Sequence, residues 1–200
     1  MSPKTLLQMA GAPLTPSPPD KAALVLIDCQ REYSEGGLKL SGIEAAVAEA
    51  AKLLSWARGR GVPVIHIVHH GKPGGALFNP EGPMAAIIPG LEPAAGEKVI
   101  AKALPNAFAG TGLQETLKAT GRSELIIAGF QTHMCVSASV RAALDLGWRT
   151  TVVASATGTR DLPNAVTGAT LPAQAIHEAT LSALADRFAI VVKDVGSLSA

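Results

Sequence analysis

Uninterrupted apolar runs that recur along the chain constrain its fold more than any other feature. Residues 22–27 (AALVLI) are all apolar, and residues 62–68 (VPVIHIV) are nearly so. A run of this length without polar alternation is typical of a strand that is buried on both faces. Six such strands are predicted, over residues 22–27, 62–68, 99–100, 124–129, 150–154 and 189–192.

Segments with helical spacing lie between the predicted strands. Ser41 and Glu44 have the spacing of a capping box at a helix start, and Gly59 marks its end. Further helices are predicted over residues 113–119, 135–146 and 171–187. Alternating strands and helices predict an α/β fold: a three-layer α/β/α sandwich around a doubly wound, mainly parallel sheet of about six strands. Its ligand site is expected at the carboxyl ends of the strands, where the strand order reverses.

Composition narrows the class of protein. With 48% hydrophobic and 16% charged residues, the chain is too apolar to be disordered. A single domain is expected over residues 21–200, preceded by an irregular, proline-rich arm over residues 1–20 that does not read as a signal peptide. The net charge of +1 and the lack of a basic stripe argue against a nucleic-acid partner.

Composition also bears on the cellular location and the oligomeric state expected for this chain. No apolar stretch is long enough to span a bilayer, so no membrane partner is expected and the cytoplasm is the default location. Cys29 and Cys135 do not suggest a disulfide scaffold. The low charged fraction favours an oligomer in which part of the outer surface is covered.

Asp28 and Cys135 each follow a predicted strand. Asp28 ends the first apolar run, which makes it either a cleft carboxylate or a simple strand-end or cap residue. Cys135 lies in a strand-to-helix turn, where unpaired N–H groups and the helix dipole favour the nucleophilic thiolate. If Thr132 caps this helix, the Cys135 N–H stays free to hold an oxyanion. The alternative for Cys135 is a small buried apolar side chain.

Lys102 stands in an otherwise uncharged stretch and is a third candidate. A lysine beside a thiol either stabilises the thiolate or accepts its proton, whereas taken alone it reads as a strand-end lysine reaching solvent. The strands ending at Asp28 and near Phe130 begin the two halves of a doubly wound sheet. They should be neighbours, so Asp28 and Cys135 should flank one cleft.

Three motifs in order make the sequence resemble the isochorismatase-like cysteine hydrolases, which include nicotinamidases and N-carbamoylsarcosine amidohydrolases. They are residues 26–33 (LIDCQREY), residues 102–113 (KALPNAFAGTGL) and residues 129–136 (GFQTHMCV). The resemblance implies a catalytic triad of Asp28, Lys102 and Cys135. It also implies an oxyanion hole formed by the backbone N–H groups of Gln131 and Cys135, and a cis Phe130–Gln131 peptide bond. A homo-oligomer, a dimer or larger, is a further implication of the resemblance.

Two departures from relatives in that family refine the expected activity. Nicotinamidases carry a metal-binding Asp-x-His segment after the first strand, but residues 34–43 hold no histidine. Neither nicotinamidase activity nor a metal or other cofactor is therefore expected. Three ligands cannot come from His66, His69 and His70 alone, because His69 faces the other side of the strand. Isochorismatases proper lack the nucleophilic cysteine, so Cys135 favours cleavage of a C–N bond.

A small-molecule pocket is expected near the triad. Its candidate lining residues are Tyr33, His70, Phe78, Phe108 and His133, and core packing is the alternative for the aromatic ones. The loops at residues 71–96 and 155–170 are expected to set specificity.

The predicted function is hydrolysis of a small amide, carbamoyl or ureido C–N bond through a thioester on the nucleophilic cysteine. One alternative is an isochorismatase-like hydrolase that acts on a non-amide bond. The other is a non-catalytic or redox-sensing thiol protein on the same fold.

Overall fold

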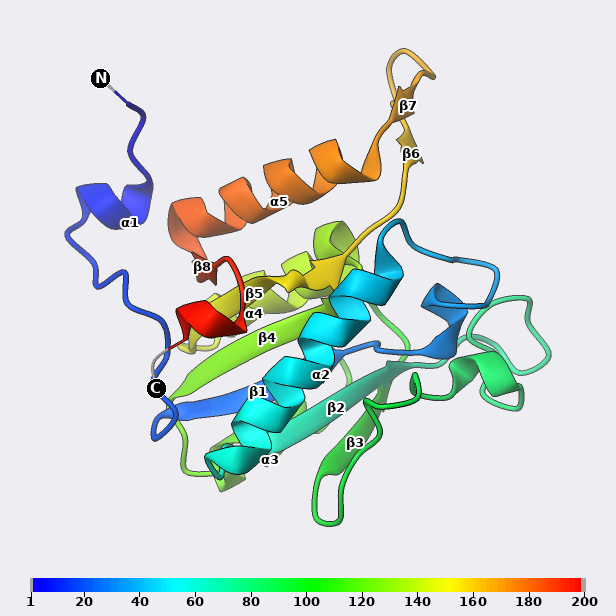
Figure 1. Ribbon diagram of the computed structural model, residues 1–200, viewed down its shortest axis with the longest axis horizontal. Coiled ribbons are helices and arrows are strands. Elements are labelled where there is room, and N and C mark those ends of the chain that lie inside the picture. Colours follow the sequence, from blue (N-terminus) through cyan, green and yellow to red (C-terminus); the bar gives the residue numbers. More distant parts are fainter. Residues whose placement is uncertain (1, 199–200) are drawn as a thin grey trace.

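The computed structural model describes residues 2–198 and is built around a six-stranded sheet (Figure 1). Every strand pair in this sheet is parallel. The elements in chain order are α1 (Leu6–Met9), β1 (Ala22–Ile27), η1 (Arg31–Tyr33), α2 (Ile43–Gly59), β2 (Val64–His69), η2 (Pro83–Ala85), β3 (Lys98–Lys102), α3 (Leu113–Ala119), β4 (Glu124–Phe130), η3 (Thr132–Val136), α4 (Ser137–Asp145), β5 (Arg149–Gly158), β6 (Leu162–Pro163), β7 (Thr170–Leu171), α5 (Ala173–Arg187), β8 (Ile190–Val192) and η4 (Val195–Ser197).

The strand order is β3-β2-β1-β4-β5-β8, which confirms the predicted doubly wound sheet. The chain builds outward from β1 through β2 to β3, then returns to the other side of β1 with β4. The order therefore reverses between β1 and β4, and a crevice forms at the carboxyl ends of strands at such a point. The register of β1 and β4 pairs Ile27 with Gly129, so these two strands end side by side as expected.

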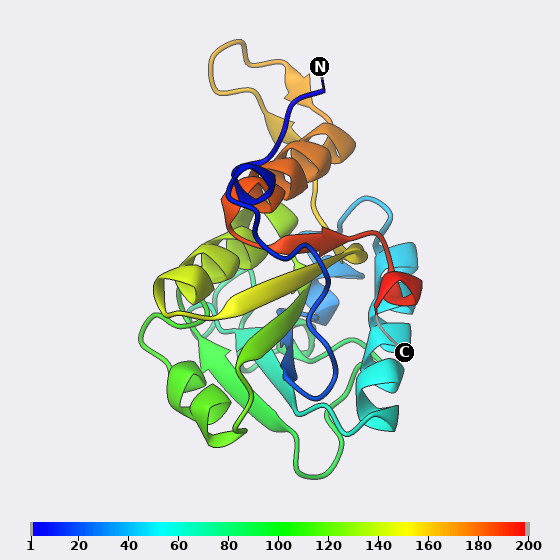
Figure 2. The ribbon, with the colours of Figure 1, turned by 90° about the vertical axis from the view of Figure 1, so that its left-hand side faces the viewer.

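Helices cover both faces of the sheet, as Figure 2 shows. All six residues of β1 are buried, which explains the absence of polar alternation in its sequence. Leu24 and Leu26 pack with α2 on one face. Val25 and Ile27 pack with α3, α4 and α5 on the other face. Two hydrophobic layers thus enclose the sheet and fix the positions of its strand ends.

Several element boundaries differ from the sequence prediction. Gly42, not Ser41, precedes the first long helix, with a positive φ of 66° and no side-chain cap. The predicted capping box is therefore wrong, and Glu44 instead pairs with Lys39 at 3.1 Å. The last long helix begins at Ala173 rather than residue 171, because β7 pairs with β6 in a small hairpin.

The proline-rich arm is more ordered than predicted. It contains the one-turn helix α1, closed by a capping box between Thr5 and Gln8. The Leu6 N–H donates to the Asp186 carboxylate of α5 at 2.7 Å, so the arm lies against that helix (Figure 2). Within residues 2–198, no helix has the length and apolar character needed to cross a membrane.

Candidate active site

Asp28, Lys102 and Cys135 come together at the carboxyl edge of the sheet. Asp28 follows β1, Lys102 is the last residue of β3, and Cys135 lies in the turn after β4. The Lys102 ammonium lies 2.8 Å from Asp28 Oδ2 and donates to Cys135 Sγ at 3.3 Å. All three side chains are buried. One cation therefore joins a carboxylate and a thiol in a space largely closed to water.

Two backbone positions allow this convergence. Asp28 has a φ of 51°, which turns the chain sharply where β1 ends; aspartate tolerates this left-handed conformation better than most residues. Gly129 has a φ of 117°, and a Cβ there would lie 2.0 Å from the Ile27 carbonyl oxygen. Only glycine lets β4 approach β1 this closely before the chain turns toward Cys135.

The turn that carries Cys135 is a π-helical turn rather than the first turn of an α-helix. It spans Thr132–Val136, and α4 begins only at Ser137. The preceding Phe130–Gln131 peptide bond is cis, as the resemblance implied.

Thr132 does not cap this helix, so the cap considered from the sequence does not form. The Met134 and Val136 N–H groups both donate to the Gln131 carbonyl instead. The Thr132 hydroxyl forms a hydrogen bond with His177 Nδ1 of α5 at 3.0 Å. His177 of α5 thus holds the nucleophile turn in place. Because His177 is far from Thr132 in sequence, the local sequence pattern did not reveal this contact.

Burial dominates the electrostatics of the site. Burial, together with the Asp28 charge, raises the pKa of Cys135 to about 12, although Lys102 opposes both effects. The expectation that position alone would favour the thiolate is therefore wrong for the resting site. Burial also raises the pKa of Asp28 to about 6, against the lowering effect of Lys102. At neutral pH the resting site holds a neutral thiol beside an ionised carboxylate.

Two side chains of the first motif organise the site, and sequence reasoning assigned neither a role. The Gln30 amide is buried and donates to the carbonyls of His69 and Ala85, while its oxygen accepts the His69 N–H at 2.7 Å. The buried Glu32 carboxylate accepts the Phe78 N–H at 3.0 Å. Both tie the loop at residues 71–96 to the end of β1. The position of Gln30 and Glu32 close to Asp28 in the sequence was the one signal that could have indicated a role in the site.

An aromatic cluster lies beside the catalytic candidates. Tyr33 packs edge-on against Phe78 and Phe130, with ring centroids 5.1 and 5.8 Å apart. His69 packs against Phe78 and places Nδ1 3.4 Å from Lys102 Nζ. The structure thus places His69 in the site, whereas the predicted His70 is exposed at the end of the strand.

The two remaining predicted pocket residues are His133, within the nucleophile turn, and Phe108. His133 Nδ1 forms a 2.6 Å hydrogen bond with Thr159 Oγ1, directly after β5. Phe108 is half-buried and packs against the hydrophobic layer that contains Cys135. Cys29 is buried next to Asp28, and both cysteines are free thiols.

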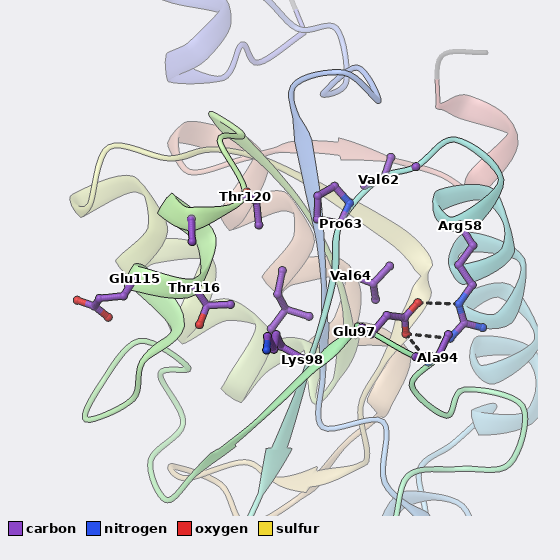
Figure 3. Close-up of a pocket in the computed structure, with 15 residues that line it drawn as sticks. Arg58, Val62, Pro63, Val64, Ala94, Glu97, Lys98, Glu115, Thr116 and Thr120 are labelled. Atoms are coloured by element: carbon purple, nitrogen blue, oxygen red, sulfur yellow. Dashed lines mark hydrogen bonds and ion pairs between the residues drawn. The ribbon is translucent and has the colours of Figure 1, made fainter.

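Two cavities differ in their relation to this site. One of about 880 Å³ lies at the amino ends of β2 and β3, where Arg58 forms an ion pair with Glu97 (Figure 3). It is at the sheet edge opposite the catalytic candidates. The other, about 360 Å³, is lined by Thr159 and His177, which contact the nucleophile turn through His133 and Thr132.

The histidines of β2 have separate surroundings. His66 is buried and lies 2.8 Å from Glu97 at the Arg58 ion pair, away from His69. Within residues 2–198, no three histidine, cysteine or acidic side chains gather closely enough to form a metal-binding group.

Comparisons with known proteins show what the chain is similar to. Residues 22–194 match the family model of the isochorismatase domain. The chain is 35% identical over 189 residues to a secreted isochorismatase effector of Verticillium dahliae, covering 94% of this chain and 96% of that protein. It is 36% identical over 156 residues to the maleamate amidohydrolase of Pseudomonas putida, covering 70% of this chain and 73% of that protein. The crystal structure of an isochorismatase from Pseudomonas putida KT2440 has a TM-score of 0.92 and 45% identity, covering 99% and 100% of the two chains.

Proposed function

The chain belongs to the isochorismatase domain family, whose members are hydrolases, and we propose that it is a cysteine-dependent amidohydrolase of small molecules. The bond cleaved is the C–N bond of an amide, carbamoyl or ureido group. The observation that carries the proposal is the Lys102 ammonium, which contacts both the Asp28 carboxylate and the Cys135 thiol. A carboxylate, a cation and a thiol held this way fit acyl transfer through a covalent thioester.

We assign the proton transfer to Asp28, because a pKa of about 6 makes it a stronger base than an ordinary carboxylate. Asp28 Oδ1 is buried and has no hydrogen-bond donor within residues 2–198, so it is available to take the thiol proton. The Cys135 sulfur attacks the carbonyl as this proton leaves. Asp28 then gives the proton to the departing nitrogen, which leaves as ammonia or an amine. Lys102 offsets the negative charge that moves between sulfur and carboxylate.

The tetrahedral oxyanion needs donors of its own. We assign this role to the backbone N–H groups of Gln131, which directly precedes the π-helical turn, and of Cys135 within it. The bond from His177 to Thr132 holds that turn in place. Water then hydrolyses the thioester, with Asp28 acting as base.

A metal has no part in the proposed mechanism, and we expect the enzyme to work as a homo-oligomer in the cytoplasm. The low charged fraction of 16% supports a partly covered surface, and two free cysteines fit a reducing compartment. Sedimentation of the purified chain tests the oligomer.

The test is a screen of small amides, ureas and carbamoyl compounds for ammonia release by the wild type and by Cys135→Ala. Release that requires Cys135 supports the proposal. Cleavage of a vinyl ether without Cys135 would instead favour the non-amide hydrolase. An alkylation pKa near 8.5 for Cys135, with no hydrolysis, would favour the inert or redox thiol.

A further inference from the structure

His69 ends β2 with its backbone held from two sides. The buried Gln30 amide, just beyond the end of β1, accepts the His69 N–H at 2.7 Å and donates to the His69 carbonyl at 2.9 Å. On the other side, the next residue, His70, donates its N–H to the Lys102 carbonyl at 2.9 Å. The end of β2 is therefore fixed between the segments that carry Asp28 and Lys102.

The His69 ring is fixed as well. It is half-buried and packs edge-on against Phe78, with ring centroids 5.0 Å apart and ring planes at 86°. Phe78 is itself held, because its N–H donates to the buried Glu32 carboxylate at 3.0 Å. Contacts to both backbone and ring leave the imidazole little freedom, so His69 Nδ1 has a defined position, 3.4 Å from Lys102 Nζ.

The Lys102 ammonium has three N–H groups to satisfy and no acceptor of its own. In the described part of the chain it has three such contacts, to Asp28 Oδ2 at 2.8 Å, Cys135 Sγ at 3.3 Å and His69 Nδ1 at 3.4 Å. Asp28 and Cys135 are the reacting groups of the proposed mechanism, whereas His69 has no part in it. Because Lys102 is buried, an N–H without an acceptor would be costly. The third acceptor therefore stabilises the ammonium at this position.

The protonation state of His69 suits this contact. Burial, together with the charges of Lys102 and His70, lowers the pKa of His69 to about 4. The ring is therefore neutral at neutral pH. Because an ammonium can only donate, Nδ1 must be the acceptor, and the ring proton is on Nε2. A protonated ring would offer no acceptor and would place a second cation beside Lys102.

We propose that His69 is a positioning residue of this site: its neutral Nδ1 accepts the third N–H of Lys102 and keeps the ammonium directed at the two reacting groups. The inference rests on the proposed function and adds a further residue to its machinery. His69 acts through Lys102, which offsets the charge that moves during the reaction. Losing the Nδ1 acceptor should therefore lower kcat and leave KM nearly unchanged.

The first experiment reads the tautomer of His69 and needs no substrate. NMR of isotope-labelled histidine side chains, with the His69 signals assigned by their loss in His69→Phe, should show Nδ1 unprotonated and Nε2 protonated at neutral pH. Lys102→Met should shift the Nδ1 signal, because it removes the donor. A proton on Nδ1, or an Nδ1 signal that Lys102→Met leaves unchanged, overturns the inference.

The second experiment separates positioning from packing with two substitutions at one site. His69→Asn loses the ring but keeps an acceptor, because the asparagine Oδ1 lies roughly where Nδ1 was. His69→Phe keeps a ring to pack against Phe78 but has no acceptor. With an amide from the ammonia-release screen, His69→Phe should lose about tenfold or more in kcat with KM within about twofold, and His69→Asn should recover most of that loss. A packing role predicts the opposite order, and that order, or wild-type kcat in His69→Phe, overturns the inference.

Alkylation of Cys135 by iodoacetamide gives a control that does not depend on turnover. His69→Phe should slow alkylation at pH 9 by about threefold or more, because the ammonium that stabilises the thiolate is held less well. In the Lys102→Met background the same substitution should change the rate by less than about twofold, and an equal slowing in both backgrounds overturns the inference. If amides are hydrolysed through Cys135 but His69→Phe matches the wild type, only this inference fails. If the tautomer and alkylation results are as expected but no amide is hydrolysed, the proposed function fails instead.

Discussion

Replacing Lys102 with methionine tests the electrostatics on which the mechanism depends. Methionine keeps the length and apolar character of the lysine stem but removes the cation that contacts Asp28 at 2.8 Å and Cys135 at 3.3 Å. Lys102 lowers the pKa of both groups in the wild type, so its loss must raise both. An opposite charge at this range is worth about one to three pKa units. The pKa of Asp28 would therefore move from about 6 to about 7–9.

Two consequences can be measured. The acidic limb of the kcat/KM profile should move upward by at least about one pH unit, because the base is now protonated at neutral pH. Alkylation of Cys135 by iodoacetamide, followed by peptide mass spectrometry, should slow by about tenfold or more at pH 9, since fewer thiols are ionised. The protein should also lose stability, because a buried carboxylate without its partner is unfavourable.

Lys98→Met is the matched control, because Lys98 is an exposed lysine at the start of the same strand. It should leave the pH profile and the alkylation rate unchanged. If Lys102→Met, shown to be folded by circular dichroism, keeps the wild-type acidic limb and alkylation rate, then Lys102 does not govern these pKa values and the electrostatic reasoning is wrong.

Three further perturbations test other parts of the structure. Asp28→Asn should lose most of its turnover while still binding substrate, and kcat near the wild-type value would mean that the base is misassigned. The same variant tests stability, because the folded-state pKa of Asp28 is raised from 3.8 to about 6 and the folded state binds this proton more tightly. The free energy of unfolding of the wild type should therefore decline relative to the variant by about 2 kcal/mol from pH 4 to 7, and equal pH slopes in urea titrations would contradict this. Gly129→Ala should lower the free energy of unfolding in urea by more than about 3 kcal/mol, because its Cβ would lie 2.0 Å from the Ile27 oxygen. The control Gly121→Ala also has a positive φ but has open space around its Cβ, so it should lose only about 1–2 kcal/mol. Equal losses in the two variants would refute the close approach. Activity should survive exhaustive chelation with EDTA, and loss that zinc or another divalent metal restores would show that a metal is required.

The fold was predictable because its signals are local and strong. Residues 22–27 have no polar residue, and such a run has few alternatives to a central strand. The rule that successive halves of a doubly wound sheet meet at their first strands then placed Asp28 and Cys135 at one edge. Lys102 was harder, since β2 lies between β3 and β1. Only its length lets the ammonium reach Asp28. Its uncharged surroundings made it a candidate, but only the family resemblance implied that it belongs to the triad.

Each failure of the sequence prediction has its own physical cause. Thr132 looked like a helix cap, but its hydroxyl is taken by His177 from α5. Ser41 and Glu44 had capping-box spacing, yet Glu44 pairs with Lys39 and Gly42 makes the turn. Helix-start position favours a thiolate in isolation, but the depth of burial of Cys135 outweighs it. Burial depends on the whole fold and cannot be read from a short motif.

The central claim is that Cys135 becomes acylated. Its most direct test is rapid-quench mass spectrometry of the wild type during turnover of an amide that the screen identifies. We expect a transient adduct with the mass of the acyl group, located on the Cys135 peptide, that forms together with one equivalent of ammonia or amine. Steady turnover with no adduct on Cys135, or equal turnover by folded Cys135→Ala, would contradict the proposed mechanism.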